Sequence, residues 1–141
     1  MTELSVRPCS WDACEKELSA IRKTVFVEEQ KVPEELEWDG EDQHASHVIA
    51  YWEGLPVGTA RLLPSGQIGR MSVLQAYRRR GVGTALLEAA EQLARTQNLP
   101  GVFLHAQSYI AHFYQQQGYA PQGNEFMDAG IPHIEMTKSF S

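Results

Sequence analysis

The apolar positions of this chain follow two different spacings, which predict helices in some segments and strands in others. The clearest helical spacing lies in one segment whose opposite face is polar. The sequence NLPG (98–101) marks the end of this predicted helix. Its apolar positions are Val82, Ala85, Leu86, Ala89, Ala90, Leu93 and Ala94. Weaker spacing from Trp11 to about Phe26 predicts one or two helices, and YIAHFYQQQ (109–117) predicts a short helix that Gly118 ends.

Strand-forming residues are concentrated in three central segments joined by short turns. These segments are HASHVIAYW (44–52), VGTARLLP (57–64) and QIGRMSV (67–73), and their spacing predicts an antiparallel meander. Further strands are predicted at LSVRPC (4–9), VFLHA (102–106) and HIEMTKSF (133–140). The pattern therefore predicts an α/β fold with a mixed sheet, in which segment 67–73, the long helix and segment 102–106 form a βαβ crossover.

The long connection from Val27 to Gln43 interrupts this pattern. It contains a proline, a glycine and little periodicity, and a connection of this length is usually functional or disordered. It also carries a dense group of acids, eight of the eighteen in the chain: Glu28, Glu29, Glu34, Glu35, Glu37, Asp39, Glu41 and Asp42. Two interpretations stay open, a solvated charged face and an acidic mouth that attracts a cationic amine.

Composition narrows the class of protein. With 141 residues, of which 43% are apolar and 21% charged, the chain is predicted to form one globular domain over residues 1–141. A formal net charge of -6 argues against a general nucleic-acid binder, which needs a broad basic face. We find no apolar run of membrane-spanning length and no signal-peptide pattern, so we expect a cytoplasmic protein without a membrane partner.

Cys9 and Cys14 form no CxxC motif and have no His at metal spacing, so we expect free thiols and no metal site.

A basic and glycine-rich turn precedes the long helix. Its residues are Arg78, Arg79, Arg80, Gly81, Val82, Gly83 and Thr84. Glycine allows a ligand to approach the backbone, the first N–H groups of a helix attract anions, and arginine suits phosphate oxygens. No Lys follows these glycines as in a P-loop, and Leu86 stands where a dinucleotide fingerprint needs Gly or Ala. The spacing that fits is basic-x-x-G-x-G.

This turn resembles that of the GNAT superfamily of N-acetyltransferases, whose hallmark is [QR]-x-x-G-x-[GA] between a bulged fourth strand and the long third helix. The resemblance implies a GNAT fold, with a mixed, mostly antiparallel sheet and a βαβ core that binds the pyrophosphate of acetyl-CoA. The segment FYQQQGY (113–119) is similar to a second landmark of the superfamily. It implies contacts of Phe113 and Tyr114 with CoA and places Tyr114 near the sulfur. Gln107 stands where many members have an Asn.

Further segments resemble small bacterial acetyltransferases of the ElaA/YjcF type, whose signature is R-x-x-V-F-V-x-E-Q followed by acidic residues and a His. The matching stretches are RKTVFVEEQ (22–30) with the residues that follow it, and AQSYIAHFYQQQGY (106–119) with DAGIPHIEM (128–136). The resemblance covers nearly the whole chain. It implies an acetyltransferase and leaves the acceptor and a homodimer, which is common in the superfamily, unassigned.

By this resemblance, the backbone of Met71, Ser72 and Val73 pairs with the pantetheine arm, and Tyr114 protonates the leaving sulfur. No Glu stands on the fourth strand, where several relatives carry a base, so the base is open between Glu29, Asp42 and His47, with His105 a weaker candidate. The expected activity is direct acetyl transfer from acetyl-CoA to a primary amine, most readily a small cationic one. The alternative is a CoA-binding module or sensor without turnover.

Overall fold

The computed structural model describes residues 3–140, which form one seven-stranded sheet in the order β1-β2-β3-β4-β5-β7-β6. All neighbouring strands are antiparallel except β4 and β5. The strands are β1 (Leu4–Cys9), β2 (Ser46–Trp52), β3 (Leu55–Leu62), β4 (Gln67–Val73), β5 (Gly101–Gln107), β6 (Ala120–Asp128) and β7 (Ile131–Ser139). The mixed α/β fold and the crossover from β4 through a long helix to β5 are confirmed.

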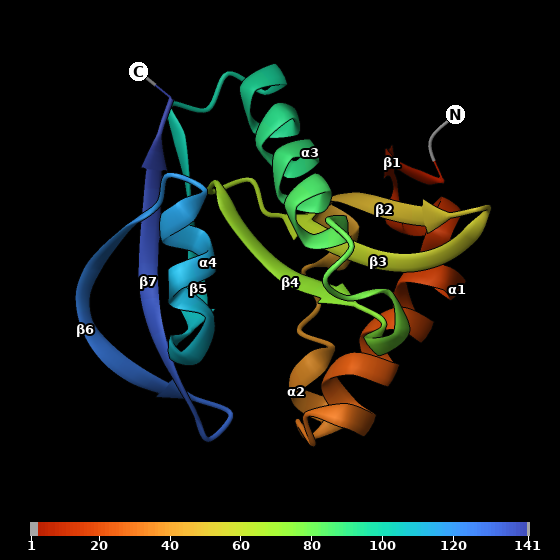
Figure 1. Ribbon diagram of the computed structural model, residues 1–141, viewed down its shortest axis with the longest axis horizontal. Coiled ribbons are helices and arrows are strands. Elements are labelled where there is room, and N and C mark those ends of the chain that lie inside the picture. Colours follow the sequence, from red (N-terminus) through yellow and green to blue (C-terminus); the bar gives the residue numbers. More distant parts are fainter. Residues whose placement is uncertain (1–2, 141) are drawn as a thin grey trace.

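Helices cover the two faces of the sheet. The long helix α3 (Val82–Thr96) and the short helix α4 (Ala111–Gln116) pack on one face (Figure 1). On the other face lie α1 (Trp11–Arg22), its π-helical continuation (Lys23–Glu29) and α2 (Glu34–Glu37). Short 3-10 turns complete the chain at Asp42–His44, Gln75–Tyr77 and Ser108–Ile110. Among the described residues, no helix is long and apolar enough to cross a membrane.

Strand β6 is the element that the sequence pattern does not predict. Its residues are almost all exposed, because it is an edge strand that pairs only with β7, and its register shifts between Gln122 and Phe126. The hairpin turn at Ala129 and Gly130 has positive φ at both residues, as a two-residue hairpin requires. Ala129 is an unusual residue for that conformation, so the sequence carries little of the usual turn signal.

Strands β4 and β5 pair only at their beginnings and then diverge. The pairs are Gln67 with Phe103 and Ile68 with Leu104, and no pair follows them in the register. Two residues of β4, Arg70 and Met71, lie opposite one residue of β3, and Arg70 has a φ of 50°. This bulge increases the local bend, so β4 turns away from β5 and the two strands open as a V in Figure 1.

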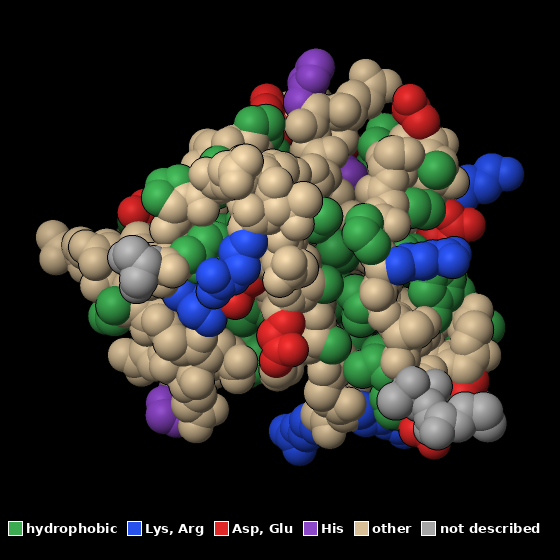
Figure 2. All heavy atoms as spheres, turned by 90° about the horizontal axis from the view of Figure 1, so that it is seen from above, with side chains coloured by type: hydrophobic (Ala, Val, Ile, Leu, Met, Phe, Trp, Pro, Cys, Tyr) green, Lys and Arg blue, Asp and Glu red, His purple; other side chains and the backbone are tan. Residues whose placement is uncertain are grey.

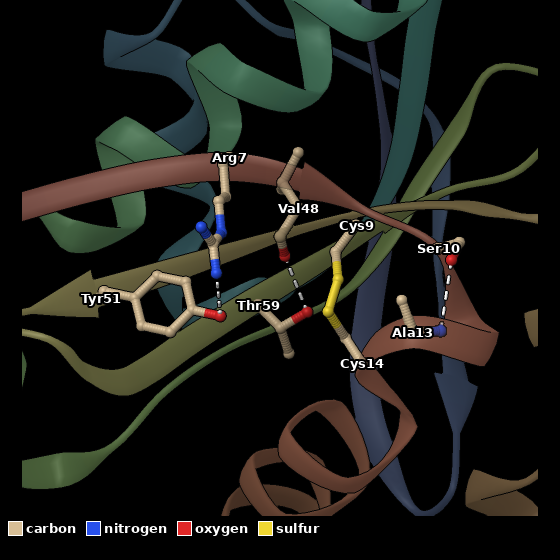
Figure 3. The surroundings of a disulfide bond; sticks show 8 residues. All are labelled: Arg7, Cys9, Ser10, Ala13, Cys14, Val48, Tyr51 and Thr59. Carbon is tan, nitrogen blue, oxygen red and sulfur yellow. Dashed lines mark hydrogen bonds between the residues drawn. A yellow bond between two sulfur atoms is a disulfide. The ribbon is translucent and has the colours of Figure 1, made fainter.

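Cys9 and Cys14 form a disulfide, so the prediction of free thiols is wrong (Figure 3). Ser10 caps α1 by accepting a hydrogen bond from Ala13 N–H, and this cap reverses the chain between the end of β1 and the first turn of the helix. The reversal brings the two Cα atoms to 6.3 Å, within the range for a disulfide. Neither CxxC spacing nor metal spacing indicates such a contact.

Six charged side chains form a closed ring that attaches the long connection to the sheet. Going round the ring, Arg22 pairs with Glu37, Glu37 with Arg70, Arg70 with Asp39, Asp39 with Arg61, Arg61 with Asp42, and Asp42 with Arg22. Positive and negative groups alternate, so the six charges sum to zero. The arginines come from α1, β3 and the β4 bulge, and the acids come from α2 and the residues that follow it.

Arg22 is the most buried member of this charge ring, with 1% of its surface exposed. Its guanidinium donates to Glu37 Oε2 and Asp42 Oδ1, each at 2.7 Å, and lies over the rings of Trp11 and Trp38. A buried cation needs partners of this kind, because removing one member of a buried ion pair costs about 3–5 kcal/mol. Three of the eight acids, Glu37, Asp39 and Asp42, therefore belong to a structural network rather than to a solvated face.

We predict that Asp39→Asn lowers the free energy of unfolding near neutral pH by an amount on the order of 1 kcal/mol, after allowance for solvent screening. Burial opposes the charged form of Asp39, but hydrogen bonds from Arg61 and the nearby Arg70 lower its pKa to about 2. A lowered carboxyl pKa stabilises the fold above its unfolded value of 3.8, and this contribution is lost as the pH falls toward 2.

Urea titrations of both proteins between pH 7 and pH 2 check this expectation, which is that the difference shrinks below pH 4. Glu88→Gln, on the exposed face of α3, is the control and should show no such change with pH. A difference for Asp39→Asn that stays constant down to pH 2 would contradict the assigned role.

Candidate active site

The predicted phosphate turn lies at the start of α3, directly after the diverging end of β4. Gly81 precedes the helix with a φ of 83°, a conformation that favours glycine, and offers no side-chain cap. The first intrahelical bond recorded there runs from Ala85 N–H to Gly81 O at 3.0 Å. The N–H groups of Val82, Gly83 and Thr84 precede it and have no acceptor within the helix. Together with the helix dipole, they form an anion-binding end.

The three arginines of the turn have different partners. Arg78 makes a two-pronged ion pair with Glu29, with Nη2 at 2.7 Å from Oε1, and its Nε donates to Val73 O at 2.9 Å. Arg80 lies over the rings of Trp52 and Tyr77. Neither Arg79 nor Arg80 forms an ion pair with residues 3–140, so both retain charge for an anion.

Gly83 and α4 lie on either side of the same space. A side chain at Gly83 would meet only the Phe113 ring, at 3.9 Å, so the helix start is open there. Phe113 contacts the neighbouring Tyr114 edge to face, with ring centroids 5.0 Å apart. The predicted CoA-binding residues of α3 and α4 therefore border one another.

Tyr114 lies in the apolar core between α3, α4 and the diverging strands, where Met71 also packs. It is 7% exposed, and its hydroxyl forms no hydrogen bond within the described chain. Burial raises its pKa. Tyr114 therefore stays protonated at neutral pH and offers an uncommitted donor at the junction of β4 and β5.

The end of β4 and the end of β5 supply the other predicted CoA residues. Ser72 is buried and its hydroxyl donates to Arg70 O at 3.4 Å, while Val73 O is already occupied by Arg78. Gln107 ends β5, and its amide donates to Gln30 at 3.0 Å. Gln107 therefore links β5 to the segment after the π-helix, on the face of the sheet opposite α4.

The two carboxylates considered as bases are both held by arginines. The hydrogen bonds from Arg78 lower the pKa of Glu29, which lies near the surface. Asp42 is buried, and although burial alone would raise its pKa, Arg22 and Arg61 lower it. A carboxylate stabilised in its charged form accepts a proton less readily, so both residues are weak bases in this arrangement.

The histidines considered as bases are also engaged. His47 is 1% exposed, burial lowers its pKa, and its Nε2 lies 2.9 Å from Asp42 O. His105 is on the open face of β5 and contacts Glu135 through Nε2 at 3.2 Å and Gln67 through Nδ1 at 3.5 Å. Neither ring leaves a nitrogen that is both accessible and without a partner.

Three features of the site have no signal in the sequence pattern. Arg22, Arg61 and Arg70 pair with three acids of the connection, Glu37, Asp39 and Asp42, yet they are far apart in the chain. Tyr109 is exposed beside the diverging strands and close enough to Arg78 to affect its electrostatics. His133, at the start of β7, pairs in register with Gln107.

Charges on the remaining surface are mixed. In Figure 2, basic and acidic side chains lie among apolar and neutral ones on the face shown, and neither sign covers it. Among the described residues, no group of three or more His, Cys, Asp and Glu side chains is arranged to hold a metal ion.

Comparisons with known proteins agree with this geometry. The acetyltransferase (GNAT) domain family matches residues 10–140. The uncharacterised N-acetyltransferase YjcF of Bacillus subtilis is 37% identical over 127 residues, covering 87% of this chain and 91% of YjcF. The crystal structure of Escherichia coli ElaA superposes with a TM-score of 0.83 at 28% identity, covering 96% of this chain and 99% of ElaA.

A more distant structure shares the fold. It is a GNAT family acetyltransferase from Elizabethkingia anophelis with acetyl-CoA bound, with a TM-score of 0.73 and 14% identity, and the match covers 99% of this chain and 100% of that one. The family match over nearly the whole chain, together with the bulged β4 and the glycine turn before α3, assigns the protein. This chain belongs to the GNAT family of acetyltransferases and is an acyltransferase.

Proposed function

We propose that this enzyme transfers the acetyl group of acetyl-CoA directly to a primary amine, and that a small cationic amine is its acceptor. The observation that carries the proposal is the start of α3, with three N–H groups free of intrahelical bonds, beside the divergence of β4 and β5. The family and the acetyl-CoA held by a structure of the same fold support the choice of donor.

The residues present suit this donor. Val82, Gly83 and Thr84 would hold the pyrophosphate through their N–H groups, with Arg79 and Arg80 adding positive charge. Met71 and Ser72 line the opening between the strands, where the pantetheine arm would lie. Acetyl-CoA supplies an acyl group activated as a thioester, so the enzyme's own task is to align the amine, remove its proton and give one to the sulfur.

Charge supports a cationic acceptor. The chain has a formal net charge of -6, and the charge ring leaves Glu28, Glu35 and Glu41 without an ion-pair partner among residues 3–140. Of these exposed acids, Glu28 lies within the π-helix and Glu35 and Glu41 follow it, on the side of the sheet where Gln107 meets Gln30. Such a surface attracts cations and repels anionic acceptors. The homodimer expected from the superfamily stays a prediction.

The amine acceptor is tested with a panel of polyamines, amino sugars, amino acids and lysine peptides, monitored by thiol release from acetyl-CoA. We expect release with small primary amines, faster for cationic than for anionic ones, and suppressed by salt. N-acetylated product, identified by mass spectrometry, is the required second readout. Tight CoA binding without acceptor-dependent release from any amine would instead favour a binding module.

We predict that Gly83→Asp weakens CoA binding by a factor on the order of 10² or more, because a carboxylate would face the pyrophosphate. The fold should not suffer, because the position is open and an acid near the start of a helix is favourable by about 0.3–1 kcal/mol. Isothermal titration with CoA and thermal melting check both parts. Gln92→Asp, which adds the same charge on the exposed face of α3, should bind normally; equal affinity in Gly83→Asp would exclude this turn as the site.

We predict that Tyr114→Phe lowers kcat roughly 10²-fold and changes KM little, since it removes a proton donor and keeps the packed ring. Tyr119→Phe is the matched control, because its ring lies in the same core and its hydroxyl donates to Glu91 at 2.8 Å. The control should lose about 1–2 kcal/mol of stability and keep its kcat. Steady-state kinetics and urea titration separate the two effects, and an unchanged kcat for Tyr114→Phe would remove it from catalysis.

A further inference from the structure

The open face of β5, β7 and β6 carries a cluster of aromatic and imidazole side chains. Val102, Leu104 and Ala106 of β5 point into the core beneath α3 and α4, so the alternate residues face the other way. That second face carries Phe103, His105 and Gln107 of β5, His133 and Glu135 of β7, and Phe126 of β6. The bond between Gln107 and Gln30 shows that this face looks toward the π-helix and the acidic connection.

His133 has the most constrained environment in this cluster. It is 9% exposed, stacks on Phe126 with ring centroids 5.9 Å apart, and lies opposite Gln107 at the end of β5. Its Nδ1 is 2.7 Å from the carbonyl oxygen of Ile131. A carbonyl oxygen can only accept, so Nδ1 carries the proton and donates. In the neutral ring Nε2 is then an unprotonated acceptor, and it forms no hydrogen bond within residues 3–140.

We propose that His133 Nε2 is the general base of the reaction, an inference that rests on the proposed acetyl transfer to an amine. In this step the acceptor nitrogen forms a bond to the acyl carbon as the carbon–sulfur bond breaks. The proton of that nitrogen passes to His133 Nε2, directly or through one water, and the departing sulfur takes a proton from Tyr114. His133 then releases its proton to solvent, and Tyr114 regains one.

His133 differs from the other candidates in combining a fixed tautomer with a position opposite the end of β5. Glu29 and Asp42 are held in their charged forms by arginines, and His47 is sealed and bonded to a backbone carbonyl. Both nitrogens of His105 have side-chain partners. Among these groups, His133 combines an oriented ring with a nitrogen that has no hydrogen-bond partner within residues 3–140, and it lies on β7 opposite the end of β5, where the acyl group would emerge between the strands.

Other titratable groups near His133 bear on its charge. On the same sheet face, His105 and Glu135 form a pair beside Phe126, whose ring lies between the two imidazoles. Toward β4, Glu29 and Arg78 neutralise each other beyond the contact of Gln107 with Gln30. Asp128 of β6 lies opposite Ile131, whose carbonyl orients the ring. A pH profile of the enzyme must therefore be compared with that of variants at these positions.

The test compares His133→Gln with His105→Gln, its matched control on the same face. For an amine that the parent acetylates, we expect His133→Gln to lower kcat at least 100-fold at pH 7, to bind acetyl-CoA normally, and to lose the acid limb of the pH–rate profile. His105→Gln should keep that limb. A His133→Gln enzyme with parental rate and profile would overturn the assignment while leaving the acetyltransferase proposal intact.

Two further results distinguish a failure of the assigned base from a failure of the proposed acetyl transfer. If the parent acetylates no amine, the proposed function fails first and the assignment of a base fails with it. Nitrogen-15 NMR of the imidazoles in the parent protein needs no variant to fold and no substrate. It should show the neutral His133 ring protonated at Nδ1, and a ring protonated at Nε2 would contradict the proposal.

Discussion

The fold of this enzyme depends on one closed ring of six alternating charges. Arg22, Arg61 and Arg70 bring three elements together, and the acids between them attach the long connection to the sheet. Buried charges are tolerated only when they are paired, so the four buried members, Arg22, Glu37, Asp42 and Arg61, depend on their partners. The ring includes Arg70, which sits in the β4 bulge with a positive φ. The interaction that holds the connection in place therefore also fixes the bend that opens the strands.

The charge ring changes how the acidic connection is interpreted. A mouth of free carboxylates would be a strong cation site, whereas five of its acids here have basic partners: Glu29, Glu34, Glu37, Asp39 and Asp42. What remains is a weaker field from exposed acids. The pair of Glu29 with Arg78 even joins the acidic connection to the phosphate turn. The acidic connection and the phosphate turn are thus in direct contact.

The sequence pattern predicts the parts of this structure that depend on local rules. The long helix, the meander, the crossover and the glycine turn follow from periodicity and from the conformations that Gly81 and its neighbours allow. Strand β6 was missed because an exposed edge strand needs no alternating apolar face, and its turn uses Ala129. The disulfide and the charge ring were missed for another reason. They depend on contacts between residues that are distant in the sequence or separated by a chain reversal, which spacing does not encode.

The arginine pairs also limit which side chains can act as a base in the site. Arginines draw carboxylates into their charged forms, so the network that stabilises the connection also makes Glu29 and Asp42 poor proton acceptors. Burial has the corresponding effect on Tyr114, whose raised pKa keeps it a donor. A base near the diverging strands must then be a group that is neutral before it accepts a proton and is not already hydrogen-bonded. An imidazole whose other nitrogen is fixed by a backbone carbonyl meets both conditions, because the carbonyl sets the tautomer without adding a charge. In this molecule the stability of the acidic connection and the choice of catalytic group are two consequences of the same electrostatics.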